Sequence, residues 1–149
     1  MEQDDVMRLK EYNTLALDVS KNRIGMAFRH KKDNMIYTLP VWYRTTLQQD
    51  IFQVSTVVNK WEIKSIVLLF PLDLKGNSTN NTVIVKNFHQ DIMYLNIPII
   101  SVDERYTTQE VKRRIQNASP KLQKITNLDS IVAANVLESL YSYNLKLTK

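Results

Sequence analysis

The chain has 149 residues, of which 44% are hydrophobic and 23% are charged, and its formal net charge at pH 7 is +5. This length and composition are typical of one globular domain that can bury an apolar core without disulfides or a structural metal. The absence of cysteine excludes thiolate zinc sites and cysteine nucleophiles, and two glycines, Gly25 and Gly76, are too few for a dinucleotide-binding or P-loop motif.

The first part of the chain predicts three strands and a helix. Residues 14–19, 23–30 and 35–41 are rich in apolar and β-branched residues and are separated by short polar breaks. Breaks this short imply an antiparallel meander. Over residues 46–61, apolar residues recur at three- and four-residue steps, which predicts a helix with one buried stripe. The stripe consists of Leu47, Ile51, Val54, Val58 and Trp61.

The rest of the chain alternates strands with helices. Residues 63–70 form a nearly continuous apolar run, typical of a strand covered on both faces, and residues 97–102 predict another buried strand. The helix between them has an inner stripe of Ile84, Phe88, Ile92 and Leu95. A capping box at residues 107–110 opens a helix through Asn117, and a last helix is predicted over residues 128–142.

This order of elements predicts an α/β fold with a mixed five-stranded sheet: a three-strand antiparallel meander plus two parallel strands, flanked by helices. We expect an N-terminal extension over residues 1–13 and a single domain over residues 14–149. The acidic, polar N-terminus does not resemble a signal peptide, and the longest apolar run is too short to span a bilayer. We therefore expect a cytoplasmic protein without membrane association.

Four acidic residues follow or end predicted elements. Asp18 ends the first strand, Asp103 and Glu104 follow the last strand, and Asp129 stands at the start of the last helix. Ligands of open α/β sheets collect at the carboxyl ends of strands, so these groups are expected near one crevice. Clustered carboxylates stay ionised together only with a compensating cation. Oxygen ligands without histidine or thiolate indicate Mg²⁺ or Mn²⁺.

Each acid also has a purely structural explanation. Asp129 is suited to cap the last helix, Asp103 to hold a turn, and Glu104 to pair with Arg105 or Arg114 on the surface. Asp18 is the hardest to explain this way, because a carboxylate inside an apolar strand costs on the order of several kcal/mol unless it is hydrated, hydrogen-bonded or metal-bound. The joint occurrence of these acids favours a functional site.

Positive charge is concentrated in residues 105–124, which carry the same net charge as the whole chain. A second basic stretch, residues 21–32, contains no acid. Concentrated positive charge on an otherwise neutral chain favours a polyanionic partner, although a solvated basic face is the alternative.

Four motifs together resemble the YqgF/RuvX family, whose members are described as Holliday junction resolvases and as nucleases that mature the precursor of small-subunit ribosomal RNA (pre-16S rRNA). The motifs are ALDVSKNRIGMAF, FPLDLKG, VDERYTTQEVKRRI and DSIVAANVLESLY. The resemblance covers about residues 14–141 and implies an RNase H-like fold.

The activity that this resemblance implies is metal-assisted hydrolysis of phosphodiester bonds. Asp18, Glu104 and Asp129 would be the catalytic ligands of Mg²⁺ or Mn²⁺, with Asp103 as an additional ligand. The substrate would be structured RNA or branched DNA, bound by a monomer or a homodimer. The residues expected to contact nucleic acid are Lys21, Arg23, Arg105, Arg113, Arg114, Lys121 and Lys124.

Two residues depart from the family pattern. Ser20 and Phe70 stand where the family usually has glycine, and the ring of Phe70 is expected near the substrate groove. These departures favour an alternative, a non-catalytic RNase H-like module that binds nucleic acid or a protein partner. Retention of all the acids favours the nuclease. An ATPase of the actin type is disfavoured, because its phosphate-binding hairpins need glycines that the chain lacks.

Overall fold

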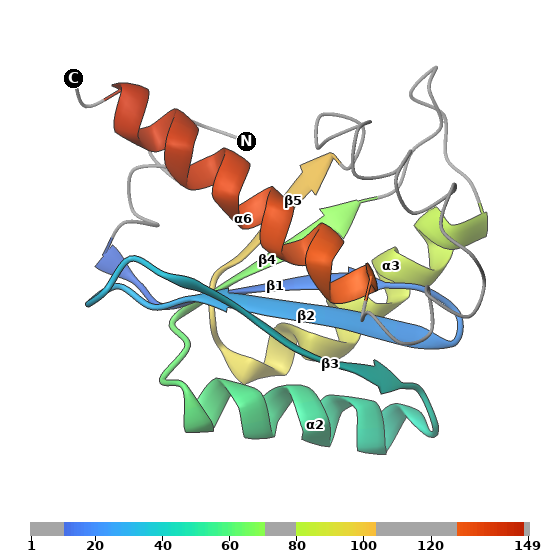
Figure 1. Ribbon diagram of the computed structural model, residues 1–149. Coiled ribbons are helices and arrows are strands. Elements are labelled where there is room, and N and C mark those ends of the chain that lie inside the picture. The colour runs from blue at the N-terminus through green and yellow to red at the C-terminus, as the bar shows by residue number, and fades with distance from the viewer. Residues whose placement is uncertain (1–10, 71–79, 104–127, 148–149) are drawn as a thin grey trace.

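A computed structural model describes residues 11–70, 80–103 and 128–147 of the chain. Figure 1 shows one sheet with helices on both faces. The strands are β1 (Thr14–Val19), β2 (Arg23–Arg29), β3 (Ile36–Tyr43), β4 (Ser65–Phe70) and β5 (Ile99–Asp103). The helices are α2 (Leu47–Lys60), α3 (Asn80–Ile92), the short 3₁₀ helix η2 (Met93–Leu95) and α6 (Leu128–Leu147).

The five strands lie in the order β3-β2-β1-β4-β5. β2 is antiparallel to both β1 and β3, because the connections between these strands are short. β4 is parallel to both β1 and β5, and helices α2 and α3 lie between the parallel strands in the sequence. The predicted meander with two added parallel strands is therefore confirmed. None of the helices in the described ranges is long and apolar enough to cross a membrane.

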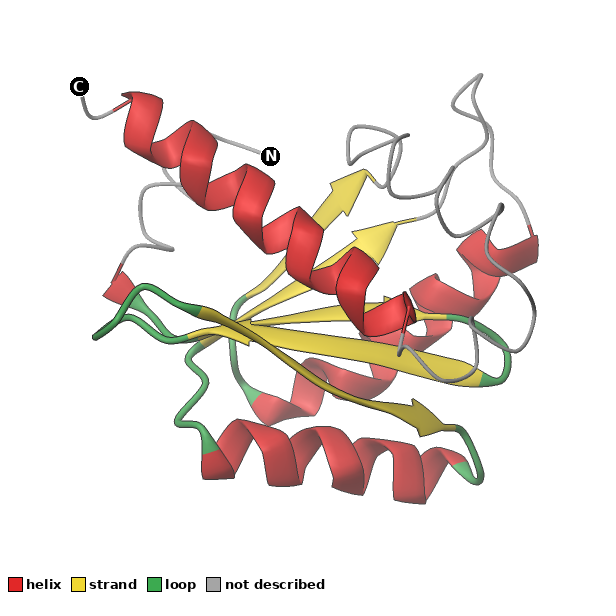
Figure 2. Ribbon diagram, in the orientation of Figure 1, coloured by secondary structure: helices red, strands yellow, loops and turns green. Residues whose placement is uncertain are grey.

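The sheet has two apolar faces, each covered by different helices. α2 and α3 pack on one face, against alternate residues of the strands such as Leu15 and Leu17. α6 packs on the other face, against the residues between them (Figure 2). On that face Ala16 and Ala27 are paired across β1 and β2, and both are fully buried. Small side chains at the centre allow the helix to lie close to the sheet.

Helix α6 is attached to the sheet at two points. Near its start, the hydroxyl of Ser130 accepts a hydrogen bond from the backbone N–H of Met26 in β2 (3.1 Å). Twelve residues or so further along, the Tyr141 hydroxyl is hydrogen-bonded to the hydroxyl of Thr14 in β1 (2.7 Å), which also contacts the hydroxyl of Ser65 in β4 (2.8 Å). These contacts set the orientation of α6 across the strands.

The predicted helices are present, with differences in which residues they bury. α2 buries Val54 and Val58 as expected, but Leu47 is 45% exposed and Asp50 is buried in its place. Leu47 is the first residue of the helix and extends beyond the sheet contact, so the prediction that it is buried was wrong. In α3, Phe88 and Ile92 are buried as expected, whereas Ile84 and Leu95 are only partly buried.

The last strand differs more clearly from the prediction. Residues 97–102 were expected to form a buried strand, but β5 is mostly half-buried and begins at Ile99. The reason is its position at the edge of the sheet, where it has only one neighbouring strand. The predicted helix over residues 107–117 and most of the predicted extension over residues 1–13 lie outside the described residues.

Candidate active site

Asp18 is positioned by the most buried strand segment of the protein. The preceding residues of β1, Leu15 to Leu17, have no exposed surface, whereas Asp18 itself is half-buried. Asp18 is paired with Gly25 across β1 and β2. Residues directly opposite each other in an antiparallel pair project to the same face of the sheet. Asp18 therefore shares a face with Ala16, and that is the face covered by α6.

The start of α6 lies directly against Gly25. A Cβ atom at residue 25 would lie 2.6 Å from the Cβ of Asp129 and closer still to the Asp129 backbone carbonyl. The pairing of β2 with β3 is irregular between Ile24 and Met26, the residues on either side of this glycine. The absence of a side chain at residue 25 thus allows Asp129 to approach the strand position opposite Asp18. The structure brings these two predicted site residues to one place.

Asp129 is also bound to the sheet by an ion pair. Its Oδ2 lies 2.7 Å from the Nε of Arg23, and the side chains of Arg23 and Asp129 are 51% and 28% exposed. Asp129 lies in the first turn of α6, where a negative charge is stabilised by the helix dipole. The arginine therefore neutralises an acid at the predicted site and remains accessible to solvent.

Asp103 lies on the opposite face of the sheet from Asp18 and Asp129. It is aligned with Phe70 in the parallel pair of β4 and β5, and aligned residues of neighbouring strands share a face. Phe70 packs against the α2 and α3 side of the sheet, while Val102 packs against the α6 side. The strand register therefore separates Asp103 from the other two acids.

Several predicted site residues lie outside the described residues. They are Glu104, Arg105, Arg113, Arg114, Lys121 and Lys124. Of the predicted nucleic-acid contacts, Lys21 and Arg23 are described, and both lie at the turn between β1 and β2, next to Asp18. Lys21 is exposed and lines a pocket of about 380 Å³ between this turn and α3.

The ring of Phe70 does not lie on the face that carries Asp18 and Asp129. It packs on the α3 side, where the Nζ of Lys86 lies 6.0 Å from the ring centroid, and it lines a pocket together with Lys86 and Ser101. The expectation that Phe70 narrows the groove near the acids is not supported by this geometry, because the strand direction turns its side chain away from them.

Ser20 has a definite role in the turn that carries the site. Its backbone N–H donates to the carbonyl of Arg23 (2.9 Å), its hydroxyl donates to the same carbonyl (3.1 Å), and the hydroxyl accepts from the backbone N–H of Arg23 (3.3 Å). A glycine at residue 20 would lack both side-chain bonds. The departure from the family pattern is therefore accommodated, and it adds hydrogen bonds to the turn.

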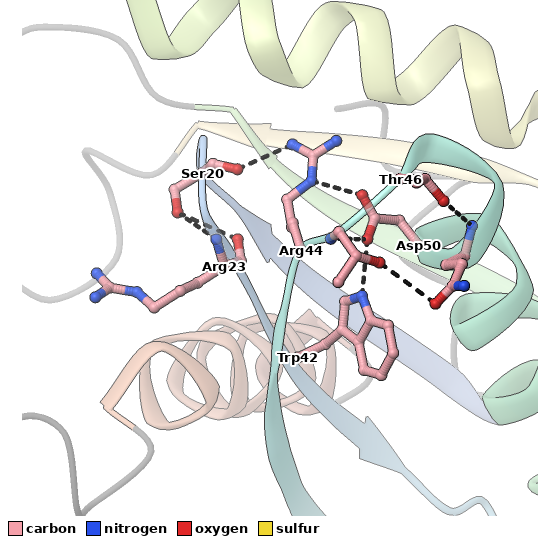
Figure 3. Close-up of polar contacts among 8 residues, drawn as sticks. Ser20, Arg23, Trp42, Arg44, Thr46 and Asp50 are labelled. Carbon is pink, nitrogen blue, oxygen red and sulfur yellow. Dashed lines mark hydrogen bonds and ion pairs between the residues drawn. The ribbon is translucent and has the colours of Figure 1, made fainter.

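A buried carboxylate close to this turn was missed by the sequence analysis. Asp50 in α2 is only 1% exposed, and it accepts hydrogen bonds from the indole N–H of Trp42 (2.8 Å), from Nε of Arg44 (2.9 Å) and from the backbone N–H of Thr45 (3.1 Å) (Figure 3). Burial by itself raises the pKa of Asp50, but the three donors outweigh it and hold the pKa below its ordinary value.

The signal that could have identified Asp50 is its helical spacing. It precedes the buried residues Val54, Val57 and Val58 by four, seven and eight positions, which places it on the same stripe. An acidic residue on a buried stripe requires hydrogen-bond donors. Trp42 and Arg44, eight and six positions earlier in the chain, supply them.

The chemistry of the acids suits a hard divalent cation. Asp18 and Asp129 offer carboxylate oxygens on one face, the donor type that Mg²⁺ and Mn²⁺ prefer. Within residues 11–70, 80–103 and 128–147, no group of three histidine, cysteine, aspartate or glutamate residues is arranged to hold a metal ion. The described residues thus supply two of the three predicted ligands, and the third, Glu104, is outside them.

Comparison with known proteins identifies relatives over most of the chain. A family described as "RuvX: Holliday junction resolvase" matches residues 12–142. A protein of Rickettsia canadensis is 28% identical over 138 residues, covering 87% of this chain and 88% of that protein. One from Carboxydothermus hydrogenoformans is 24% identical over 134 residues, covering 89% and 97%. Both are named "Putative pre-16S rRNA nuclease".

Solved structures with a similar fold are Holliday junction resolvases. Thermus thermophilus RuvC in complex with its Holliday junction substrate superposes with a TM-score of 0.57 at 9% identity, covering 88% of this chain and 94% of RuvC. The yeast mitochondrial Holliday junction resolvase superposes with a TM-score of 0.52 at 13% identity, covering 98% and 88%. At such low identity these matches establish the fold, which is RNase H-like as predicted.

Proposed function

Because this chain belongs to the RuvX family of Holliday junction resolvases, we propose that it is a divalent-metal-dependent endonuclease that hydrolyses phosphodiester bonds. The observation that carries the proposal is the approach of Asp129 to Gly25, directly opposite Asp18. Two acids that are 111 positions apart in the sequence meet on one face of the sheet, next to a turn that carries Lys21 and Arg23. A purely structural role for either acid does not require the other.

The proposed metal ligands are Asp18, Glu104 and Asp129. Glu104 follows Asp103 in the sequence and therefore has the strand parity of Val102, whose side chain packs on the α6 side. An extended backbone through residue 104 would direct its carboxylate to the face of Asp18 and Asp129. By the same parity, Asp103 is the weaker candidate for direct coordination and is assigned an outer role.

A bound divalent ion would supply an activated water and stabilise the leaving oxygen in an in-line displacement. The protein residues would position the reacting groups. Asp18 is held by the buried part of β1, and Asp129 by its contacts with β2. Arg23 offsets the repulsion between the acids in the metal-free protein, and because half of its side chain is exposed, it is free to turn towards a substrate phosphate.

The proposed substrates are precursor ribosomal RNA and branched DNA. The names of the relatives favour the RNA, and the name of the family favours the junction. Lys21 and Arg23, together with the basic residues of 105–124, would contact phosphates. Cutting both strands of a junction requires two active sites, so DNA as the substrate implies a homodimer, whereas a monomer suffices for RNA.

The decisive experiment compares the wild-type protein with Asp18→Asn in Mn²⁺, on precursor 16S ribosomal RNA and on a four-way DNA junction. We expect the wild type to cut at least one substrate and Asp18→Asn to cut neither. A matched control is Glu138→Gln, which removes one negative charge from an exposed position of the same helix as Asp129 and should cut normally. Binding without cleavage by the wild type would overturn the proposal in favour of the non-catalytic module.

A further inference from the structure

A buried ion pair lies on the opposite face of the sheet from Asp18 and Asp129, and the proposed mechanism does not use it. Asp50 and Arg44 approach to 2.9 Å, with side chains that are 1% and 17% exposed. A buried pair of this kind is weak evidence for stability by itself, because desolvation of the two charges offsets their attraction. Its geometry shows a different role.

Arg44 holds both sides of the turn between β1 and β2. Its guanidinium Nη1 donates to the carbonyl oxygen of Ser20 (3.0 Å), and its backbone N–H donates to the carbonyl oxygen of Asn22 (2.8 Å). Asp50 fixes the guanidinium that makes the first of these bonds, since Nε of Arg44 donates to its Oδ2. Figure 3 shows the side chain of Arg44 between Asp50 and Ser20.

The turn in its other direction leads to the proposed metal site. The hydroxyl of Ser20 is hydrogen-bonded to the backbone of Arg23, and Nε of Arg23 is paired with Asp129. Asp18 lies two residues before Ser20 in the same chain segment. The contacts therefore run without a gap from Asp50 through Arg44, Ser20 and Arg23 to Asp129.

We infer that Asp50 and Arg44 are positioning residues for the active site: they hold the β1–β2 turn so that Arg23 and Asp18 keep their places relative to Asp129. This inference rests on the proposed nuclease function. The two charges neutralise each other, so the pair holds the turn without adding net charge beside a polyanionic substrate. Neither residue contacts the reacting groups, and each acts through the turn.

Asp50→Asn is designed to release Arg44 selectively. The amide oxygen can continue to accept from Trp42 and Thr45, but the amide NH₂ that replaces Oδ2 would face the Nε of Arg44, and two donors do not bond. Arg44→Lys is a second variant in case the first folds poorly. It keeps the charge beside Asp50 and loses the forked geometry that reaches Ser20 at the same time.

Thr46→Ala is the matched control. The hydroxyl of Thr46 caps the same helix by accepting from the backbone N–H of Gln49 (3.2 Å), and it bonds neither to Arg44 nor to the turn (Figure 3). Removing this cap destabilises α2 from its N-terminus without releasing the turn. Any effect that follows general destabilisation appears in this control as well.

Two measurements test the inference, at a temperature where all variants are folded. The first is the rate of cleavage in Mn²⁺, separated into kcat and KM. We expect kcat to fall about ten- to hundredfold in Asp50→Asn and in Arg44→Lys, with little change in KM and little change in Thr46→Ala. The second is hydrogen exchange of the backbone amides of Ser20 and Arg23, which should become faster in the two variants and not in the control.

The two measurements distinguish the possible failures. If the wild type cuts neither substrate, the proposed nuclease function is overturned, and amide exchange still decides whether Asp50 holds the turn. If the wild type cuts and Asp50→Asn and Arg44→Lys retain the kcat of Thr46→Ala, the positioning role is overturned and the nuclease function stands. Unchanged exchange at Ser20 and Arg23 overturns the positioning role in either case.

Discussion

Gly25 of β2 lies directly against Asp129 of α6, so closely that a single methyl group at residue 25 would overlap the backbone of the helix. We expect Gly25→Ala to force the start of α6 away from the sheet and to lower the free energy of unfolding by about 1–3 kcal/mol, the usual range for overpacking. Urea unfolding monitored by circular dichroism measures this change. Ala134→Ser, at a partly buried position of the same helix, is the control and should change it less.

The same variant links packing to metal binding. Movement of Asp129 away from Asp18 should weaken the proposed site, so Mn²⁺ should raise the melting temperature of Gly25→Ala less than that of the wild type. An equal rise in both proteins would show that the approach of α6 to Gly25 is unrelated to metal binding.

Asp18→Asn should leave the fold intact. The amide is nearly isosteric with the carboxylate and removes repulsion from the neighbouring acids, so the melting temperature without metal should stay equal or rise. The rise in melting temperature that Mn²⁺ produces in the wild type should shrink, because less ion binds to the native state. Differential scanning calorimetry with and without Mn²⁺ makes both measurements. A variant melting well below the wild type without metal would instead assign Asp18 a structural role.

Basic residues of the segment 105–124 should dominate the salt dependence of nucleic-acid binding. Neutralising four of them should weaken binding and flatten the dependence of the logarithm of the affinity on the logarithm of the salt concentration, by about 0.9 for each lost phosphate contact on duplex DNA. The four are Arg113, Arg114, Lys121 and Lys124.

A control with the same change in net charge neutralises four exposed lysines at the other end of the sheet. These are Lys31, Lys32, Lys60 and Lys64. Fluorescence anisotropy at several salt concentrations compares the two variants. Equal slopes in both would show that the charge of residues 105–124 is only a solvated face.

Phe70→Gly should not increase cleavage, although glycine is the family's usual residue. The ring packs on the α3 side of the sheet, away from Asp18, so its removal opens no space beside the acids. Loss of the partly buried ring should instead lower the free energy of unfolding by about 2–4 kcal/mol. Chemical denaturation and the cleavage rate at a temperature where both proteins are folded test this. A higher kcat in the variant would contradict the placement of the ring.

The stability of the protein should depend on pH through Asp50. Its pKa is lowered in the folded protein, so its contribution is complete above the unfolded-state pKa of about 3.9 and is lost as the pH falls towards the lower folded-state value. The free energy of unfolding should therefore decrease more steeply below pH 4 in the wild type than in Asp50→Asn. Urea unfolding between pH 3 and pH 7 compares the two, and parallel curves would contradict the assignment.

Local sequence patterns predicted most of the fold, because they reflect contacts between residues close in the chain. The short breaks after residues 19 and 30 imposed the antiparallel meander, and helical spacing identified α2. The same spacing would have placed Asp50 inside the protein, but a charged residue is not counted as part of an apolar stripe. Its burial depends on Trp42 and Arg44, whose donors reach it only after β3 and α2 have packed together.

The candidate site was predicted less completely, for a different reason. Alternation along β1 places Asp18 on the face of Ala16, but both faces of this sheet are apolar, and the sequence does not reveal that α6 covers that one. The same limitation affected Asp103, which shares a strand end with Glu104 in the sequence and lies on the α3 face in the structure. The contact of Gly25 with Asp129 became evident only from the packing of α6.

The attachment of α6 has a consequence for when the protein becomes active during synthesis. The hydrogen bond of Met26 with Ser130 joins residues 104 positions apart, and that of Thr14 with Tyr141 joins residues 127 positions apart. Contacts of such long range form only after the ribosome has released the helix, while β1 and β2 can pair much earlier. Asp129 thus joins Asp18 at the end of translation, and a nascent chain carries no assembled pair of acids while it is still attached to the ribosome.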